Sequence, residues 1–212
     1  MVGLAERLRL VVITDDEVLQ HRRLIDVVST ALAAGAPAVQ LRSKKASPRE
    51  LLATAGRIRE EAQRWNALFF MNDRVDLALA AHADGVHLGE DDLPVASARA
   101  LGGPGLVIGF SASTPEEARE GVRQGADYIG CGSVFATTSK ADAGAPIGTD
   151  GLAGVARAVD VPVVAIGGIT VSSAQAVKES GAAGCAVIGA IMGAPDIPEA
   201  VVGLVSPWKG HP

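Results

Sequence analysis

The chain carries two acidic side chains at positions that suit a bound cation. Asp73 follows the apolar run Leu68–Met71, and Asp92 follows the next run, Gly85–Leu88. If these runs are neighbouring strands of a parallel barrel, the residues that follow them meet at the same rim. Mg²⁺ is commonly held by one or two carboxylates, while water and substrate phosphate complete its shell. The pair therefore predicts a magnesium site.

Basic residues and glycines follow other apolar runs in the way that phosphate sites require. Arg42, Lys44 and Lys140 supply positive charge that suits phosphate oxygens. Gly167-Gly168 and Gly189 follow two later runs, where barrels often bind a phosphate through backbone amides. Together these residues predict two phosphorylated groups, a diphosphate bound with Mg²⁺ and a monophosphate.

Structural roles are the alternative for each of these residues taken singly. An Asp directly after a strand often caps the next helix, and Arg42 can form a salt bridge with Asp73 at the rim. His87 lies within an apolar run, which favours a buried, hydrogen-bonded role over a catalytic one. Cys131 and Cys185 match no metal-binding spacing, and we expect both to be packed core thiols.

Eight short apolar runs recur along the chain, each followed by a stretch with helical spacing. This alternation is typical of parallel strands covered by helices. The 212 residues divided among eight units give about 26 residues per unit, which predicts a compact single-domain (β/α)8 barrel. An open, doubly wound sheet is the alternative. The runs are Leu8–Ile13, Ala38–Leu41, Leu68–Met71, Gly85–Leu88, Leu106–Phe110, Tyr128–Cys131, Val163–Ile166 and Cys185–Ile188.

Several helix boundaries can be predicted from local signals. Ser47–Glu50 and Thr114–Glu117 have the pattern of capping boxes, with Pro at the first helical position. A glycine is expected to end the helix before three of the strands, at Gly35, Gly125 and Gly181. Residues 206–212 are expected to form a flexible tail.

Composition narrows the classes of function. Hydrophobic residues make up 48% of the chain but aromatic residues only 3%, so the core must be built from Ala, Val, Leu and Ile. The net charge of −5 argues against nucleic acid as a partner. No apolar run approaches the roughly 20 residues of a membrane span, and no signal peptide is visible. We expect a cytoplasmic protein with phosphorylated small-molecule substrates, and the sequence leaves a homo-oligomer open.

A series of motifs in order matches one enzyme family. The motifs are ITD (13–15), VQLRSK (39–44), NDRVD (72–76), ADGVHLGEDD (83–92), GADYIG (125–130), TTSK (137–140) and AIGGI (165–169). On these motifs, the chain resembles the thiamine phosphate synthase (thiamine-phosphate pyrophosphorylase) family over nearly its whole length. The resemblance implies a (β/α)8 barrel that joins hydroxymethylpyrimidine diphosphate to hydroxyethylthiazole phosphate, requires Mg²⁺ and works by a dissociative mechanism.

The resemblance also implies roles for individual residues. The pyrimidine diphosphate would be held by Gln40, Leu41, Arg42, Ser43, Lys44, Asn72, Ser111 and Lys140. The thiazole phosphate would be surrounded by Thr137, Thr138, Ser139, Gly168, Ile188 and Gly189. Asp73 and Asp92 would ligate Mg²⁺, and Arg42, Ser111 and Lys140 would be catalytic. Lys140 lies in the long connection 132–148, a length that suggests a lid over the site.

Some positions depart from the family pattern. Glu90 stands where the family usually has Gln, Ser113 where it has His, and Gly189 where it often has Ser. Ser133 and Ala136 stand where family members often have Pro. Two alternative functions remain at this point. A related thiazole tautomerase would lack Asp73 and carry His near Ser133, and a barrel that senses thiamine precursors would bind without turnover.

Overall fold

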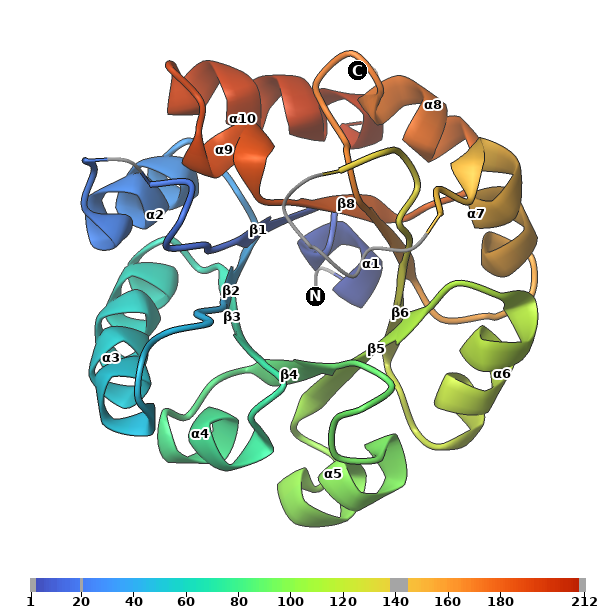
Figure 1. The fold of residues 1–212 in the computed structure, drawn as a ribbon, viewed down its shortest axis with the longest axis horizontal. Helices are drawn as coiled ribbons and strands as arrows, with labels where there is room; N and C mark the ends of the chain where they lie inside the picture. The colour runs from blue at the N-terminus through green and yellow to red at the C-terminus, as the bar shows by residue number, and fades with distance from the viewer. Residues whose placement is uncertain (1–2, 20, 138–144, 210–212) are drawn as a thin grey trace.

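Eight parallel strands close into a barrel in the order in which they occur along the chain (Figure 1). The computed structural model describes residues 3–19, 21–137 and 145–209. The first and last strands pair, with Leu10 opposite Cys185, so the sheet has no open edge and the predicted (β/α)8 barrel is confirmed over the open sheet. The strands are β1 (Leu10–Ile13), β2 (Ala38–Leu41), β3 (Leu68–Asn72), β4 (Gly85–Leu88), β5 (Val107–Ala112), β6 (Tyr128–Cys131), β7 (Val163–Ile166) and β8 (Gly184–Val187).

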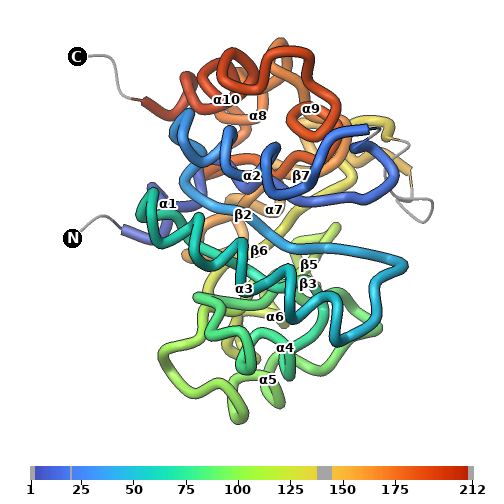
Figure 2. The backbone as a smooth tube through the Cα atoms, turned by 90° about the vertical axis from the view of Figure 1, so that its left-hand side faces the viewer, coloured from blue at the N-terminus to red at the C-terminus, as the bar shows by residue number. Residues whose placement is uncertain are grey.

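Helices surround the barrel and a short one lies beneath it. Their bounds are α1 (Leu4–Arg7), α2 (Leu24–Ala33), α3 (Pro48–Arg64), α4 (Val75–Ala80), α5 (Val95–Gly102), α6 (Pro115–Arg123), α7 (Gly148–Ala156), α8 (Ala174–Glu179), α9 (Gly189–Met192), α10 (Ile197–Val205) and the 3₁₀ helix η1 (Ser206–Trp208). In Figure 2, α1 lies at the end of the barrel opposite the connections that lead from strands to helices. None of the helices in the described part of the chain is long and apolar enough to cross a membrane.

The side chains of each strand alternate between the barrel lumen and the layer between strands and helices. One buried cluster fills the lower lumen with residues such as Val11, Phe70 and Val164. A larger cluster, which includes Val12 and Val39, joins the outer faces of the strands to the helices. This alternation explains the continuous apolar runs, because both faces of every strand are covered.

The predicted helix boundaries are confirmed. Ser47 and Thr114 each accept a hydrogen bond from the Glu three residues later, and both capping boxes are complete. Gly35, Gly125 and Gly181 end their helices with φ of 99°, 106° and 90°, the left-handed region that only glycine enters without strain.

The start of the expected tail is ordered. Residues 206–208 form η1, and the ring of Trp208 is buried. Its Nε1 donates to the carbonyl of Ala182 at 2.9 Å, in the turn before β8. Trp208 thus has both apolar surroundings and a hydrogen-bond acceptor, a contact that the expectation of a flexible tail did not include. Residues 210–212 lie outside the described part.

Candidate functional site

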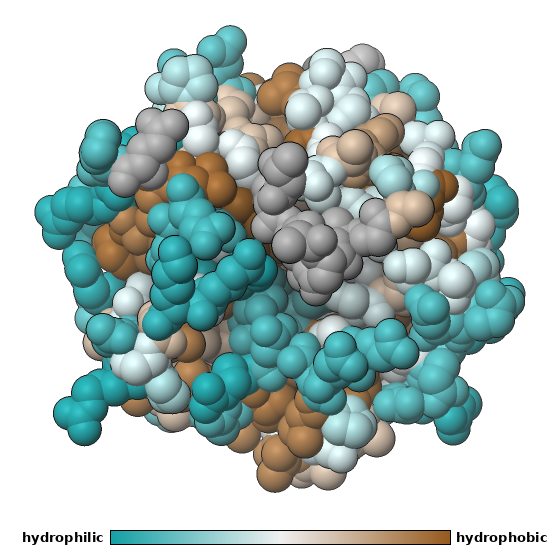
Figure 3. All heavy atoms as spheres, in the orientation of Figure 1, coloured by the Kyte–Doolittle hydropathy of each residue, from teal (hydrophilic) through white to brown (hydrophobic). Residues whose placement is uncertain are grey.

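Four polar side chains from successive strands face the upper lumen. They are Gln40 on β2, Asn72 on β3, His87 on β4 and Ser111 on β5, and each alternates with an outward-facing apolar neighbour. Asn72 pairs with His87 in register, so their side chains are neighbours across the sheet. Figure 3 shows hydrophilic side chains gathered to the left of and below the centre of this face. Three residues of the predicted pyrimidine site, Gln40, Asn72 and Ser111, thus lie on adjacent strands, with His87 among them.

The connections above β1 and β2 are joined by a buried ion pair. The Arg42 Nη1 lies 2.8 Å from the Asp15 Oδ2, and the side chains are only 12% and 4% exposed. The hydroxyl of Thr14 accepts from the Arg42 backbone N–H and donates to its carbonyl, both at 2.8 Å. These contacts fix the guanidinium in place at the rim. Arg42 thus forms its salt bridge with Asp15 and not with Asp73, the alternative partner suggested by the sequence, and no role had been predicted for Asp15.

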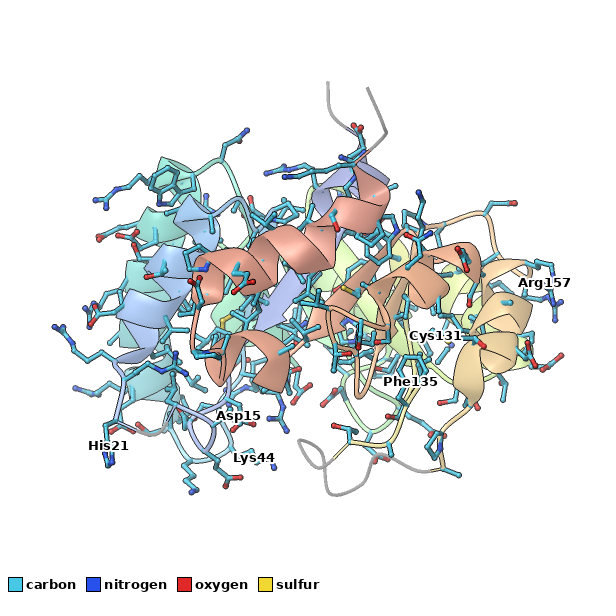
Figure 4. The ribbon with its side chains drawn as sticks, turned by 90° about the horizontal axis from the view of Figure 1, so that it is seen from above. Asp15, His21, Lys44, Cys131, Phe135 and Arg157 are labelled. Carbon is cyan, nitrogen blue, oxygen red and sulfur yellow. The ribbon has the colours of Figure 1, made fainter. Side chains whose placement is uncertain are left out.

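Lys44 and Ser43 lie next to this ion pair. Lys44 is exposed near Asp15 (Figure 4), and it makes no ion pair with any residue that the structure describes. Together with Asp16 and Lys45 it borders a small recess at the rim. The Ser43 hydroxyl donates to the Asp16 carboxylate. The recess is also lined by Asp15 and Glu17, so Lys44 is an exposed cation among acidic side chains at the rim.

The two predicted metal ligands follow β3 and β4, which are paired strands. Asp73 has a left-handed backbone, with φ of 62°, and its N–H donates to the His87 carbonyl at 2.8 Å. The Asp92 Oδ2 accepts from the Gly89 N–H at 2.7 Å. Neither residue caps a helix, because the N-caps of α4 and α5 are Arg74 and Pro94. The alternative reading of both residues as caps is therefore wrong.

This donor set fits a hard cation that shares its shell with a substrate. One or two carboxylates are the usual protein share of an Mg²⁺ site, and Asp73 and Asp92 follow two paired strands. Within the described residues there is no group of three or more His, Cys, Asp or Glu side chains that could hold a metal alone. A cation here would need oxygen ligands from water and phosphate.

His87 is hydrogen-bonded on both sides inside the lumen. Its Nδ1 lies 2.9 Å from the Tyr128 hydroxyl, and its Nε2 lies 3.0 Å from the Ser111 hydroxyl. Tyr128 is almost completely buried, and burial holds its pKa well above the usual range. The hydrogen-bonded role expected for His87 is confirmed. Tyr128 was missed as a residue of the site, although it lies within the GADYIG motif (125–130) and begins an apolar run.

The glycines after β7 allow two connections to touch. Gly167 and Gly168 have φ of 99° and 63°, and an added Cβ would lie 2.1 Å from the Ser133 Oγ and 2.4 Å from the Ala136 carbonyl oxygen. The Phe135 N–H donates to the Gly167 carbonyl at 3.0 Å. The pair is thus required for packing against residues 133–136. Gly189 differs, because open space surrounds the position of its absent Cβ.

The remaining predicted site residues differ in where the structure places them. Leu41 is 2% exposed in the layer facing the helices, so its side chain does not reach the mouth, and only its backbone can contribute there. Ile188 is partly buried between the two apolar clusters at the start of α9. Thr137 is half-buried near the mouth. Thr138, Ser139 and Lys140, with the middle of the expected lid, lie outside the described residues.

Comparison with known proteins gives the same family as the sequence motifs. The family model described as thiamine monophosphate synthase matches residues 10–191. The chain belongs to this family. Its transferase class and its place in thiamine biosynthesis, both predicted from the resemblance, are confirmed.

Individual relatives cover most of the chain. It is 49% identical to a thiamine-phosphate synthase of Moorella thermoacetica over 176 residues, which are 83% of this chain and 84% of that relative. It is 46% identical to the one of Pyrococcus abyssi over 202 residues, or 94% of each. The solved thiamine phosphate pyrophosphorylase of Pyrococcus furiosus superposes with a TM-score of 0.89 at 42% identity, covering 98% of this chain and all of that one.

Two of the five departures from the family pattern have a structural explanation. The Ser133 hydroxyl is buried and donates to the Phe135 carbonyl at 2.8 Å. The Ser113 hydroxyl donates to the Gly132 carbonyl at 2.9 Å. Glu90 is exposed on the connection after β4. Two of these departures thus serve the connections around the mouth, and Glu90 adds a negative charge that solvent screens.

Proposed function

We propose that this chain joins hydroxymethylpyrimidine diphosphate to hydroxyethylthiazole phosphate, giving thiamine phosphate and diphosphate. The observation that carries the proposal is the high identity to thiamine-phosphate synthases over more than four fifths of the chain. The polar upper lumen and the buried Asp15–Arg42 pair supply a site of suitable chemistry at the barrel mouth.

The pyrimidine diphosphate would bind across β2 to β5. Gln40, Asn72 and Ser111 face the lumen, where they can hydrogen-bond the ring or its substituents. Arg42 and Lys44 lie at the rim above them and suit the diphosphate, and we assign Ser43 and Lys140 to the same group. The thiazole phosphate would lie on the opposite side of the mouth, near Thr137, Thr138, Ser139, Gly168, Ile188 and Gly189.

Asp73 and Asp92 would hold Mg²⁺ together with diphosphate oxygens. When bound, the ion would supply positive charge that stabilises the negative charge growing on the departing diphosphate. The positions of the two carboxylates, after paired strands and beside the lumen-facing Asn72 and His87, support this assignment.

The mechanism we propose needs no nucleophile from the protein. The bond between the pyrimidine methylene carbon and the diphosphate oxygen breaks, and its electron pair leaves with the diphosphate. Arg42, held by Asp15, is already oriented toward the rim and stabilises that charge without reorganising. The thiazole nitrogen then donates its lone pair to the cationic methylene and forms the new C–N bond. The protein must also keep water away from this cation.

The two cysteines are consistent with such a mechanism. Burial raises the pKa of the Cys131 and Cys185 thiols to about 12, and the charge of Glu117 contributes further at Cys131. Thiols of this kind stay protonated and are poor nucleophiles at neutral pH.

The two alternative functions make different demands on the site. A tautomerase needs an acid or base where Ser133 stands, but the Ser133 hydroxyl is buried and bonded within its own connection. The presence of Asp73 also favours the synthase. A sensing barrel would keep the anion-binding residues and lack turnover.

One assay separates the three functions. Purified protein is incubated with both phosphorylated precursors and Mg²⁺, and thiamine phosphate and diphosphate are quantified. Formation of both products in equal amounts is expected. Isomerisation of a carboxylated thiazole phosphate without coupling would support the tautomerase, and binding of the precursors without either reaction would support the sensor.

A further inference from the structure

A hydrogen-bonded series crosses the lumen from the closed centre of the barrel to the mouth. It starts at the Tyr128 hydroxyl on β6, passes through both ring nitrogens of His87 on β4 and ends at the Ser111 hydroxyl on β5, with distances of 2.9 and 3.0 Å. The ring of Tyr128 is held edge-on by Phe70, with 5.7 Å between their centroids. The innermost member is thus fixed by packing.

The inner end of the series determines where the imidazole proton lies. Within the described structure, the Tyr128 hydroxyl has His87 Nδ1 as its hydrogen-bond partner and no other. Burial keeps the phenol protonated. Its hydrogen therefore has an acceptor only if Nδ1 carries a lone pair. A proton on Nδ1, in either a neutral or a charged ring, would leave a buried donor unsatisfied, which is unfavourable.

The outer end of the series follows from the inner end. With Nδ1 as acceptor, the neutral ring of His87 carries its proton on Nε2, which donates to the Ser111 oxygen. Ser111 makes no other side-chain hydrogen bond to a described residue, so its own O–H can turn toward the mouth. The direction of every bond in the series is then set from Tyr128 outward.

We propose that Tyr128 and His87 are positioning residues that present the Ser111 hydroxyl as a hydrogen-bond donor to an acceptor atom of the pyrimidine diphosphate. The inference rests on the proposed function for the identity of that substrate. The donor direction itself is argued from the contacts of His87 with Tyr128 and Ser111.

Two glycines confine the rings to this arrangement. Gly109 lies opposite both His87 and Tyr128 in register, and a Cβ there would lie 2.1 Å from the Tyr128 ring and 2.5 Å from the His87 Nδ1. At Gly130, the Cβ would lie 2.6 Å from the His87 ring. The lumen therefore leaves space for the two rings only where the neighbouring strands have no side chain.

The first test measures the tautomer without any functional assay. Nitrogen-15 NMR of the whole protein resolves the ring nitrogens of its four histidines, and the signal lost in a His87→Asn variant assigns His87. A neutral ring protonated at Nε2 is expected. A ring protonated at Nδ1, or at both nitrogens, overturns the proposal.

The second test is a double-mutant cycle in the functional protein. Ser111→Ala is expected to lower kcat/KM for the pyrimidine diphosphate by about tenfold, as loss of one substrate hydrogen bond would. Tyr128→Phe should lower it several-fold and leave the KM for the thiazole phosphate unchanged. In the Ser111→Ala background, Tyr128→Phe should have no further effect, because the series no longer has an end. The positioning role is contradicted if the losses in kcat/KM of the two single variants multiply in the double variant. It is also contradicted if Tyr128→Phe affects both substrates equally.

Phe70→Leu is the matched control. It loosens the packing of Tyr128 but keeps every hydroxyl, so thermal stability should fall while His87 keeps its tautomer. In Tyr128→Phe, His87 should become a mixture of tautomers, and an unchanged tautomer would count against the proposal. If the natural protein shows no coupling of the two precursors, the proposed function fails, and the tautomer measurement still decides the direction of the series.

Discussion

The lumen has two sides that differ in chemistry. On β2 to β6, the upper lumen carries Gln40, Asn72, His87 and Ser111, with Tyr128 below them. On β7, β8 and β1, the inward-facing side chains are apolar or absent, and they are Val11, Ile13, Val164, Ile166, Gly184 and Ala186. All eight strands are short, and each pairs in parallel with two neighbours, so the architecture of the barrel does not impose this difference.

The difference shows that one barrel can carry hydrogen-bonding side chains on one side of its lumen and packed apolar side chains on the other. The polar side can bind a ring with several hydrogen-bonding groups, while the apolar side leaves recognition to backbone atoms of the connections above it. The turn at Gly167-Gly168 illustrates this, because its glycines permit contact with residues 133–136. Substitutions on the polar side should therefore change mainly catalytic constants, and substitutions on the apolar side should change mainly stability.

The largest effect is expected at the rim of the polar side, in Asp73→Asn. Asn tolerates the left-handed backbone that Asp73 adopts, so the variant removes charge without adding strain. Most Mg²⁺-dependent activity should be lost, by about a hundredfold or more in kcat/KM, with little change in melting temperature. The measurement is activity as a function of Mg²⁺ concentration.

Asp76→Asn is the control for that variant. Asp76 is an exposed partner of Arg74, at 2.6 Å, and this hydrogen bond lowers the pKa of its carboxyl. Its loss should leave the Mg²⁺ dependence unchanged. Equal losses in both variants would show that local charge, and not a metal ligand, matters at this rim.

An effect close to that of Asp73→Asn is expected from Lys140→Ala, which tests whether the charge of the connection 132–148 acts during the reaction. Loss of one group that stabilises developing charge costs about 3 kcal/mol, on the order of a hundredfold in turnover. The KM for the pyrimidine diphosphate should change much less. Lys45→Ala, which removes an exposed partner of Glu17, is the control in the same kinetic assay. An unchanged turnover number would mark Lys140 as a solvated lysine.

Alanine substitutions at two glycines of the barrel should differ in their effect on the free energy of unfolding. Gly109→Ala places a methyl group against Tyr128 and His87 and should destabilise the fold by about 1–3 kcal/mol. Gly189→Ala meets open space and should be nearly neutral. Chemical denaturation of both variants checks the difference. Equal destabilisation would mean that the space around His87 is more adaptable than the distances indicate.

The smallest effect is expected for the cysteines of the outer layer. With pKa values of about 12, on the order of one thiol in 10⁴ is ionised at pH 8, so alkylation of the native protein should be very slow. Because these pKa values are raised on folding, their contribution to stability is present below about pH 8.5 and declines as pH rises toward 12. Mass spectrometry with and without denaturant checks the labelling. Rapid labelling of the native protein would show that this layer opens.

Local signals made most of the fold predictable. The apolar runs gave every strand to within a few residues, and the capping boxes at Ser47 and Thr114 needed only four consecutive residues to be recognised. Leu41 stays a predicted site residue through its backbone alone, because strand alternation turns its side chain away from the lumen.

Long-range pairs were beyond prediction. Asp15 and Arg42 are 27 residues apart, and His87 and Tyr128 are 41 apart. Nothing in the local sequence links them, because their contact depends on the register of strands and on glycines that leave space between them. The metal site stayed a prediction for a related reason, since two carboxylates complete such a site only with the oxygens of a ligand.

The pairing of β1 with β8 has a consequence for how the chain is made. A ribosome releases β1 long before β8, so the backbone edge of β1 that faces β8 lacks its partner until synthesis is almost finished. Contacts of such long sequence separation form slowly, and an unpaired strand edge can pair with another chain. Nascent chains that stall before residue 184 should therefore depend on chaperones more than the completed barrel does.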